Sequence, residues 1–138
     1  RPYHATSIGK AMVAGMNEKR MQKLLSRLEL TDFTANTITD AVALLPELKL
    51  VRARGYAFDD EEIVKGVRCV GVPLFAIHGE VVGAVSLSAP AHRMPTERIN
   101  EIVAALSAIA RQVTAARAAS ASHRPKTPGP RAPASTKP

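Results

Sequence analysis

The chain has 138 residues, of which 46% are hydrophobic, with a formal net charge of +7 and a single cysteine. This length suits one domain with a core of its own. One cysteine excludes an internal disulfide framework, and no apolar run of about 18 residues and no signal-peptide pattern is present. These features predict a cytoplasmic protein with a free thiol and no membrane contact. Because the first residue is Arg1 and not Met, we expect the chain to be part of a longer protein.

Two short helices are predicted near the start of the chain. Thr6 and Ser7 offer a hydroxyl cap to a helix with a terminal glycine at Gly15. Asn17 caps a second helix. Its apolar residues share one face at helical spacing: Met21, Leu24, Leu25 and Leu28.

A third helix is predicted between Asp40, its cap, and Gly55. The polar residues 31–39 before it form a loop or a short strand. Pro46 would remove a hydrogen bond inside the helix, so the helix is either kinked or starts at Pro46. Its inward-facing residues are Leu44, Leu48 and Val51.

Residues 67–77 and 80–89 are predicted to form an antiparallel hairpin, fed by an acidic turn at residues 59–62. His78 and Gly79 serve as a two-residue loop in this prediction. The resulting register has three diagnostic pairs: Phe75 with Val82, Gly71 with Ser86, and Cys69 with Ser88.

The two faces of this hairpin differ in character. One carries Cys69, Ser86 and Ser88 around Gly71, which has no side chain to fill the space between them. The other is apolar enough for a core: Val70, Val72, Leu74, Val81, Val85 and Leu87.

The last part of the chain divides into a helix and a tail. Pro95 suits the first position of a final helix. Its apolar stripe consists of Ile99, Ile102, Val103, Leu106, Ile109 and Val113. Residues 118–138 are basic and rich in proline, which predicts a disordered tail after a folded unit at residues 1–117. Such a tail could touch nucleic acid, although a solvated terminus is the preferred interpretation.

Five segments in one order resemble the C-terminal effector-binding domain of IclR-type bacterial transcriptional regulators. They are residues 4–11 (HATSIGKA), 37–39 (TIT), 54–62 (RGYAFDDEE), 66–69 (GVRC) and 86–88 (SLS), the last followed by Pro90. The resemblance covers residues 2–116. It implies an α/β (α+β), GAF-like fold in which helices flank an antiparallel sheet.

The resemblance also implies a division of labour within a longer regulator. In the family, a winged helix-turn-helix binds DNA and the C-terminal domain senses a small molecule, usually in a homodimer or homotetramer. This chain has no helix-turn-helix, and the family's first strands, which precede the His-Ala motif, are missing. We therefore expect a sensor domain truncated at its N-terminal side, whose sheet lacks an edge or is completed by a partner.

Carried over position by position, the family's small-acid pocket falls on six residues: Ser7 and Ile8 (through backbone amides), Asp59, Cys69, Ser86 and Ser88. The start of a helix attracts an anion through unpaired N–H groups, and serine hydroxyls can donate to the same carboxylate. Asp59, if ionised, can only accept, so it should meet a hydroxyl or hydrate of the ligand, or a donor of the protein. The family often has Gly and Ala where Ser7 and Ile8 stand, which alters the size of ligand that fits.

Simpler interpretations remain for each of these residues. Cys69 suits a buried structural thiol, the two serines suit hydroxyls bonded to backbone, and residues 59–62 suit a solvated turn. An enzyme built on Cys69, His4 and Asp59, or a zinc site with a further ligand, is an alternative function. No metal-type spacing links these residues, so no catalytic residue, metal or cofactor is expected. The third alternative is a dimerisation module without a ligand.

Overall fold

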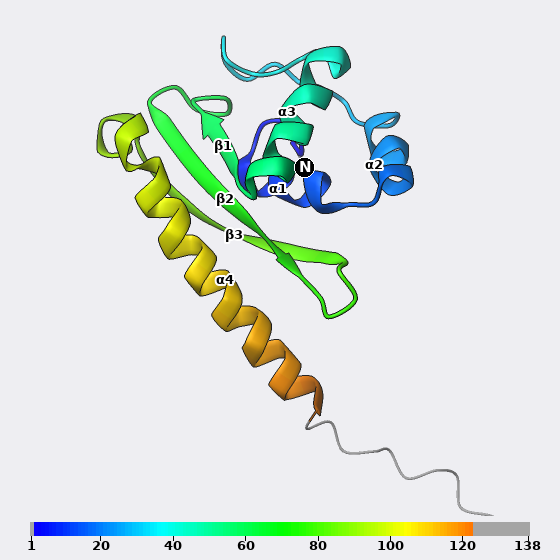
Figure 1. The fold of residues 1–138 in the computed structure, drawn as a ribbon. Coiled ribbons are helices and arrows are strands. Elements are labelled where there is room, and N and C mark those ends of the chain that lie inside the picture. Colours follow the sequence, from blue (N-terminus) through cyan, green and yellow to red (C-terminus); the bar gives the residue numbers. More distant parts are fainter. Residues whose placement is uncertain (1, 123–138) are drawn as a thin grey trace, which may run out of the picture.

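The computed structural model describes residues 2–122. Its main elements are α1 (Ser7–Gly15), α2 (Glu18–Leu25), α3 (Ala41–Arg54), β1 (Ala57–Asp60), β2 (Val67–Phe75), β3 (Val81–Pro90) and α4 (Ile99–Ser122). The strands form an antiparallel sheet in the order β1-β2-β3. Figure 1 shows α1 and α3 on one face of this sheet and α4 along the other. The predicted class, an antiparallel sheet flanked by helices, is confirmed.

The caps of the first two helices are confirmed. The Thr6 hydroxyl accepts a hydrogen bond from the Gly9 amide at 2.9 Å, and the Asn17 side chain accepts one from the Arg20 amide at 2.8 Å. Gly15 does not end α1 in a left-handed conformation, because it is the last helical residue and the cap that follows it is extended. A methyl group at Gly15 would lie 3.0 Å from Cβ of Val81, so this glycine permits α1 to approach β3.

α3 follows the predicted caps and inward face. Asp40 accepts a hydrogen bond from the Val42 amide, Gly55 has a φ of 86°, and the inward side chains are buried: Leu44, Leu48 and Val51. Starting the helix at Pro46 was the wrong alternative, since α3 begins at Ala41 and contains the proline. Residues 31–39 form a loop without strand structure.

β1 was not predicted as a strand. Its acidic end was expected as a turn, but Asp59 and Asp60 both lie in β1, paired with Cys69 and Arg68 of β2. Four residues that end in two acids resemble a turn in sequence. The alternation of buried and half-buried residues in β1 is nevertheless that of a strand.

The hairpin register is confirmed along most of its length, with Cys69 opposite Ser88 and Gly71 opposite Ser86. The predicted tip is wrong. The loop has three residues, 77–79, closed by hydrogen bonds from Ala76 N to Glu80 O (2.8 Å) and from Gly79 N to Ala76 O (2.9 Å). A bulge then pairs Phe75 with Val81 instead of Val82.

The physical reason lies in the loop residues. A two-residue loop would need a positive φ at His78 or a glycine in its place, whereas the three-residue loop needs a positive φ only at Gly79, where φ is 83°. The extra loop residue and the bulge compensate each other. The register beyond Leu74 is therefore the predicted one.

Each face of the sheet carries its own core. The first core consists of buried side chains of α1, α2 and α3 together with Ala57 of β1 and Val81 of β3. On the other face, Val70 and Val72 pack against Met94 and residues of α4: Ile99, Ile102, Leu106 and Ala110. Two predicted core positions are corrected. The bulge turns Val81 to the α1 face, and Leu87 stays 44% exposed because β3 is the outer strand of the described sheet.

α4 is preceded by two 3-10 turns, at Ala91–Arg93 and Thr96–Arg98, and Pro95 caps the second turn instead of starting the helix. Ile109, predicted to face the core, is 45% exposed, and Ala110 is buried in its stead. α4 runs to Ser122, past the boundary expected after Arg117, because its alanine-rich end favours a helix. By length and composition, the stretch Thr96–Ser120 is apolar enough to span a membrane, and only 17% of its apolar window is buried, on the side that packs against the sheet. The remaining predicted tail lies outside the described residues.

Candidate functional site

Three of the six predicted site residues form a row across the sheet. Asp59 of β1 is paired with Cys69 of β2, which is paired with Ser88 of β3. The sulfur of Cys69 and the hydroxyl oxygen of Ser88 are 3.0 Å apart. The thiol also interacts with the Asp59 carboxylate, so the three side chains share one face.

The next row lies under the start of α1. It consists of Ala57, Gly71 and Ser86, and a methyl group at Gly71 would come within 2.7 Å of the Ser7 carbonyl oxygen. α1 therefore rests directly on the backbone of β2, and only glycine permits this approach.

The first amides of α1 divide into two sets. Those of Gly9 and Lys10 donate to the Thr6 hydroxyl and carbonyl. Among residues 2–122, the amides of Ser7 and Ile8 have no acceptor. Unpaired N–H groups at a helix start carry partial positive charge and attract anions.

The six residues differ widely in burial. Ser7 and Asp59 are 2% and 4% exposed, Cys69 is half-buried, and Ile8, Ser86 and Ser88 are exposed. A cavity of about 390 Å³ touches the neighbouring turn through Phe58, Asp60 and Glu62, but none of the six residues lines it. Within the described residues, the predicted site is thus an open face of the sheet.

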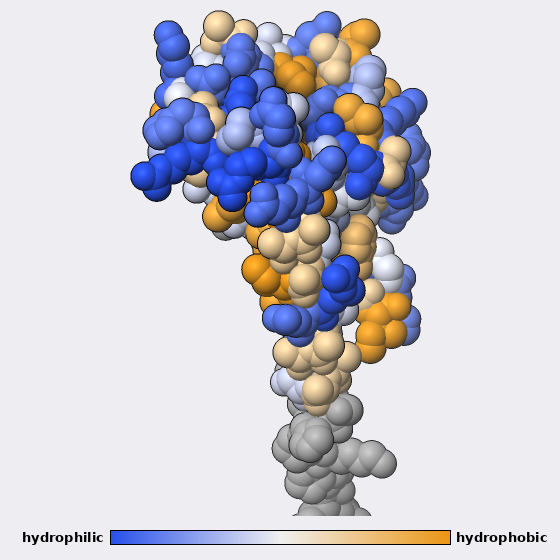
Figure 2. All heavy atoms as spheres, turned by 60° about the vertical axis from the view of Figure 1, so that its left-hand side comes forward, coloured by the Kyte–Doolittle hydropathy of each residue, from blue (hydrophilic) through white to orange (hydrophobic). Residues whose placement is uncertain are grey.

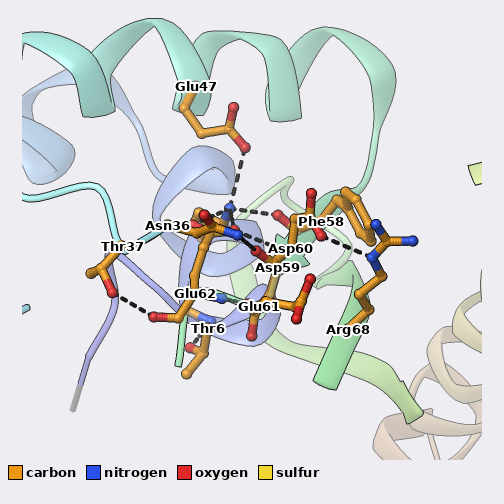
Figure 3. Close-up of polar contacts among 12 residues, drawn as sticks. Thr6, Asn36, Thr37, Glu47, Phe58, Asp59, Asp60, Glu61, Glu62 and Arg68 are labelled. Atoms are coloured by element: carbon orange, nitrogen blue, oxygen red, sulfur yellow. Dashed lines mark hydrogen bonds and ion pairs between the residues drawn. The ribbon is translucent and has the colours of Figure 1, made fainter. Parts of the chain in front are cut away.

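Lys10 is a residue of this region that the sequence reasoning missed. It is 1% exposed, and its ammonium group donates to the Phe58 carbonyl at 2.6 Å and to the Glu62 carboxylate at 2.9 and 3.0 Å. A third acceptor, Glu47 of α3, lies at 3.2 Å (Figure 3). The available signal was its spacing, because Lys10 falls on the buried stripe of α1: Ser7, Lys10, Ala11 and Ala14.

The turn after β1 is held from two sides. Within it, the Glu62 amide donates to Asp59 Oδ1 at 2.8 Å, and Glu62 Oε2 accepts from the Asp60 amide at 2.9 Å. Side chains of the loop before α3 bind its three successive carbonyls (Figure 3). The Asn36 side chain donates to the Asp60 carbonyl (2.9 Å), the Thr34 hydroxyl to the Glu61 carbonyl (2.6 Å) and the Thr37 hydroxyl to the Glu62 carbonyl (2.6 Å). The polar loop therefore positions Asp59.

Burial dominates the electrostatics of this face. It raises the pKa of the Asp59 carboxyl, against the smaller opposing effects of the Glu62 amide, Lys10 and Cys69. It also raises the pKa of Glu62 in spite of the ion pair with Lys10. The pKa of the Cys69 thiol is raised by burial as well, so the sulfur is a neutral thiol at neutral pH and not an activated nucleophile.

The residues of the alternative enzyme site are not brought together. His4 is buried, lies 2.8 Å from the Thr31 carbonyl oxygen through Nε2, and stacks on Phe33. The described part of the chain shows no contact from His4 to Cys69 or Asp59, and no group of three or more potential metal ligands.

Comparison with known proteins identifies the family. Residues 1–115 match the family described as bacterial transcriptional regulator IclR C-terminal. The chain belongs to this IclR family. KdgR of Escherichia coli, an HTH-type transcriptional regulator, is 40% identical over 114 residues, which cover 83% of this chain and 43% of KdgR. The chain spans less than half the length of the curated relatives that it matches. These relatives are named as transcriptional regulators or repressors.

Solved structures of IclR relatives share the fold. The C-terminal domain of E. coli KdgR superimposes with a TM-score of 0.78 at 39% identity, over 83% of this chain and 70% of that one. The inducer binding domain of a double mutant of PobR from Acinetobacter, in complex with 3-hydroxybenzoic acid, gives a TM-score of 0.75 at 27% identity. That comparison covers 82% of this chain and 67% of the PobR chain.

Proposed function

We propose that this face binds a small organic acid, the effector of an IclR-type transcriptional regulator. The observation that carries the proposal is the start of α1, whose two amides without acceptors lie on the same face as the Cys69–Ser88 pair. The bound 3-hydroxybenzoic acid in the PobR domain supports this class of ligand.

The predicted residues contribute to effector binding in three ways in this proposal. The amides of Ser7 and Ile8 and the hydroxyls of Ser86 and Ser88 donate to the effector carboxylate. Cys69 forms a polarisable wall, and Asp59 meets a polar group of the effector. An acid of about six non-hydrogen atoms gains at most about 1.5 kcal/mol per atom, and most ligands gain far less. Micromolar to millimolar affinity is therefore expected.

We further propose that effector binding acts on DNA through rearrangement of an oligomer in the cytoplasm. The DNA-binding domain would lie outside this chain, and the oligomer would be a homodimer or homotetramer. Figure 2 shows apolar residues gathered on the narrow end of the molecule, over the hairpin tip and the end of α4. Ile77 and Phe75 are 77% and 40% exposed there. Exposed apolar surface of this kind is typical of contacts with another chain.

Replacement of Ser88 tests the effector site. Because a hydrogen bond to a charged group contributes roughly 1.5–3 kcal/mol, Ser88→Ala should weaken acid binding about ten- to a hundredfold. A thermal-shift screen of the purified chain against small carboxylic and aromatic acids selects the ligand, and calorimetric titration measures the two affinities.

Ser107→Ala is the matched control, since it removes the same hydroxyl from α4 on the opposite face of the sheet. It should bind the acid as the wild type does. Equal affinities for wild type and Ser88→Ala would mean that the acid binds elsewhere.

A dimerisation module without a ligand is the second candidate. The exposure of Ser86 and Ser88 favours it, because an effector on an open face gains little burial. In that case no acid would shift the melting temperature, whereas the apparent molecular mass measured in solution would still rise with protein concentration, because the chains associate.

A further inference from the structure

Asp59 is a buried carboxylate without an ion pair among residues 2–122. The Asp59 side chain accepts hydrogen bonds from the backbone amide of Glu62, at 2.8 Å, and from the Cys69 thiol. Both donors are neutral. A charge with 4% exposure and no counter-ion is costly to keep ionised.

The charged groups nearby are already paired with one another. Both carboxylate oxygens of Glu62 accept hydrogen bonds from the Lys10 ammonium group, which also forms an ion pair with Glu47 of α3. Arg68 binds the Asp60 carboxylate at 2.8 Å. The titratable and charged groups that face Asp59 are Lys10 of α1, Asp60 of β1, Glu62 of the following turn and Cys69 of β2, while β3 contributes only hydroxyls.

An organic acid bound at Ser88 would therefore bring a second negative charge to this face and meet no unpaired cation. Ser88 and Asp59 lie on the outer strands of this row, about 10 Å apart along the sheet, and the Cys69 side chain contacts both of them. A second negative charge on the same face disfavours the ionised form of a buried carboxyl that has no counter-ion.

We propose that Asp59 takes up one proton when the effector binds, so that the domain senses an organic acid together with a proton. This inference rests on the proposed effector site. The proton comes from solvent and stays on the Asp59 carboxyl, while the effector remains a carboxylate held by amides and hydroxyls. Protonated Asp59 can donate a hydrogen bond, which its ionised form cannot.

The sign of the pH dependence follows from this balance. Burial already raises the pKa of Asp59 in the free protein, and a bound anion raises this pKa further. Between the two pKa values, each acid molecule binds with one proton, so its affinity falls as pH rises, by about tenfold per pH unit. Below the lower pKa the carboxyl is already protonated, and the affinity is independent of pH.

Calorimetry on the intact chain measures this proton directly. 3-Hydroxybenzoate, lactate and acetate are titrated at several pH values between about 6 and 7.5 in PIPES and in imidazole, whose heats of ionisation differ. Between the two pKa values of Asp59, the difference in binding heat should correspond to roughly one proton taken up per acid bound. Asp59→Asn keeps a donor and carries no charge, so it should bind the acid without proton uptake and without pH dependence.

Asp60→Asn is the matched control, because Asp60 is adjacent, pairs with Arg68 and is 47% exposed. It should take up the proton as the wild type does. Acid binding by the wild type without proton uptake would overturn the inference and leave the effector site standing, as would unchanged uptake in Asp59→Asn. If no acid of the thermal-shift screen binds, these three included, the effector proposal itself is refuted. The wild-type measurement decides the question even if Asp59→Asn does not fold.

Discussion

At the scale of single residues, Lys10 connects the two halves of the proposed site. Its ammonium group bonds to the carbonyl of Phe58 on one side of Asp59 and to Glu62 on the other. Its backbone belongs to the same first turns of α1 as Ser7. A single buried side chain thus fixes the helix start relative to the acidic turn.

Removal of the Lys10 charge should be strongly destabilising. In Lys10→Met, Glu62 would remain buried without its partner, and breaking a buried ion pair from one side typically costs about 3–5 kcal/mol. Chemical unfolding of Lys10→Met and of Lys65→Met, whose residue is exposed, measures the difference. A loss of less than about 1 kcal/mol in Lys10→Met would show that this cluster does not stabilise the fold.

The residue scale also marks a limit of the sequence. Cys69, Ser86 and Ser88 could be placed on one face because strand alternation follows from the sequence alone. Lys10 was missed although its spacing places it on the buried stripe of α1, since a lysine on a short helix normally faces solvent. Its burial depends on Glu62 and Glu47, which reach it from parts of the chain far away in sequence. Ion pairs between residues so far apart in the sequence leave no periodic pattern in it.

At the scale of elements, the contact between α1 and β2 positions the anion-attracting amides. α1 lies on Gly71 because a glycine leaves room for the Ser7 backbone. The loop at residues 34–37 binds the turn after β1 and thereby fixes the other end of the site. Gly71 and the loop at residues 34–37, neither of which contacts the effector in the proposal, thus set the geometry of the face.

Gly71→Ala tests this contact. The added methyl group would lie 2.7 Å from the Ser7 carbonyl, so α1 must shift, at a cost of about 1–3 kcal/mol. Acid binding should weaken together with stability, because the amides of Ser7 and Ile8 move with α1. Unfolding and titration measure both effects.

Gly83→Ala is the matched control in the adjacent strand, since its methyl group would meet only Leu74 at an ordinary 3.6 Å. Its stability and acid affinity should stay close to those of the wild type. Normal acid affinity in Gly71→Ala would exclude the start of α1 from the site.

The elements differ in how far the sequence predicts them. Four helix ends were predictable, because Thr6, Asn17, Asp40 and Gly55 satisfy local backbone groups. Both ends of α4 were mispredicted. β1 was not, since four residues carry too little periodicity and gain their strand structure from pairing with β2. The tip of the hairpin was mispredicted for a conformational reason, the negative φ that His78 prefers.

At the scale of the whole molecule, one thin sheet separates two cores. The α1–α3 core supports the proposed effector face, and the α4 core supports the opposite face. β1 contributes to both, with Ala57 in the first core and Phe58 packed against the second, because alternate residues of a strand point to opposite sides. Stability is therefore expected to be shared by the two halves, whereas effector binding belongs to one of them.

Leu106→Ala separates these two properties. Leu106 is 7% exposed between α4 and the sheet, and truncation of a buried leucine costs about 2–5 kcal/mol. Ile109→Ala, at a 45% exposed position on the same helix, should cost less than about 1 kcal/mol. Urea unfolding should show a single transition in both variants. At a temperature where both are folded, each should bind the acid as tightly as the wild type. A weakened affinity in Leu106→Ala alone would instead mean that the sheet transmits changes in the α4 core to the effector face, and α4 would then belong to the signalling path.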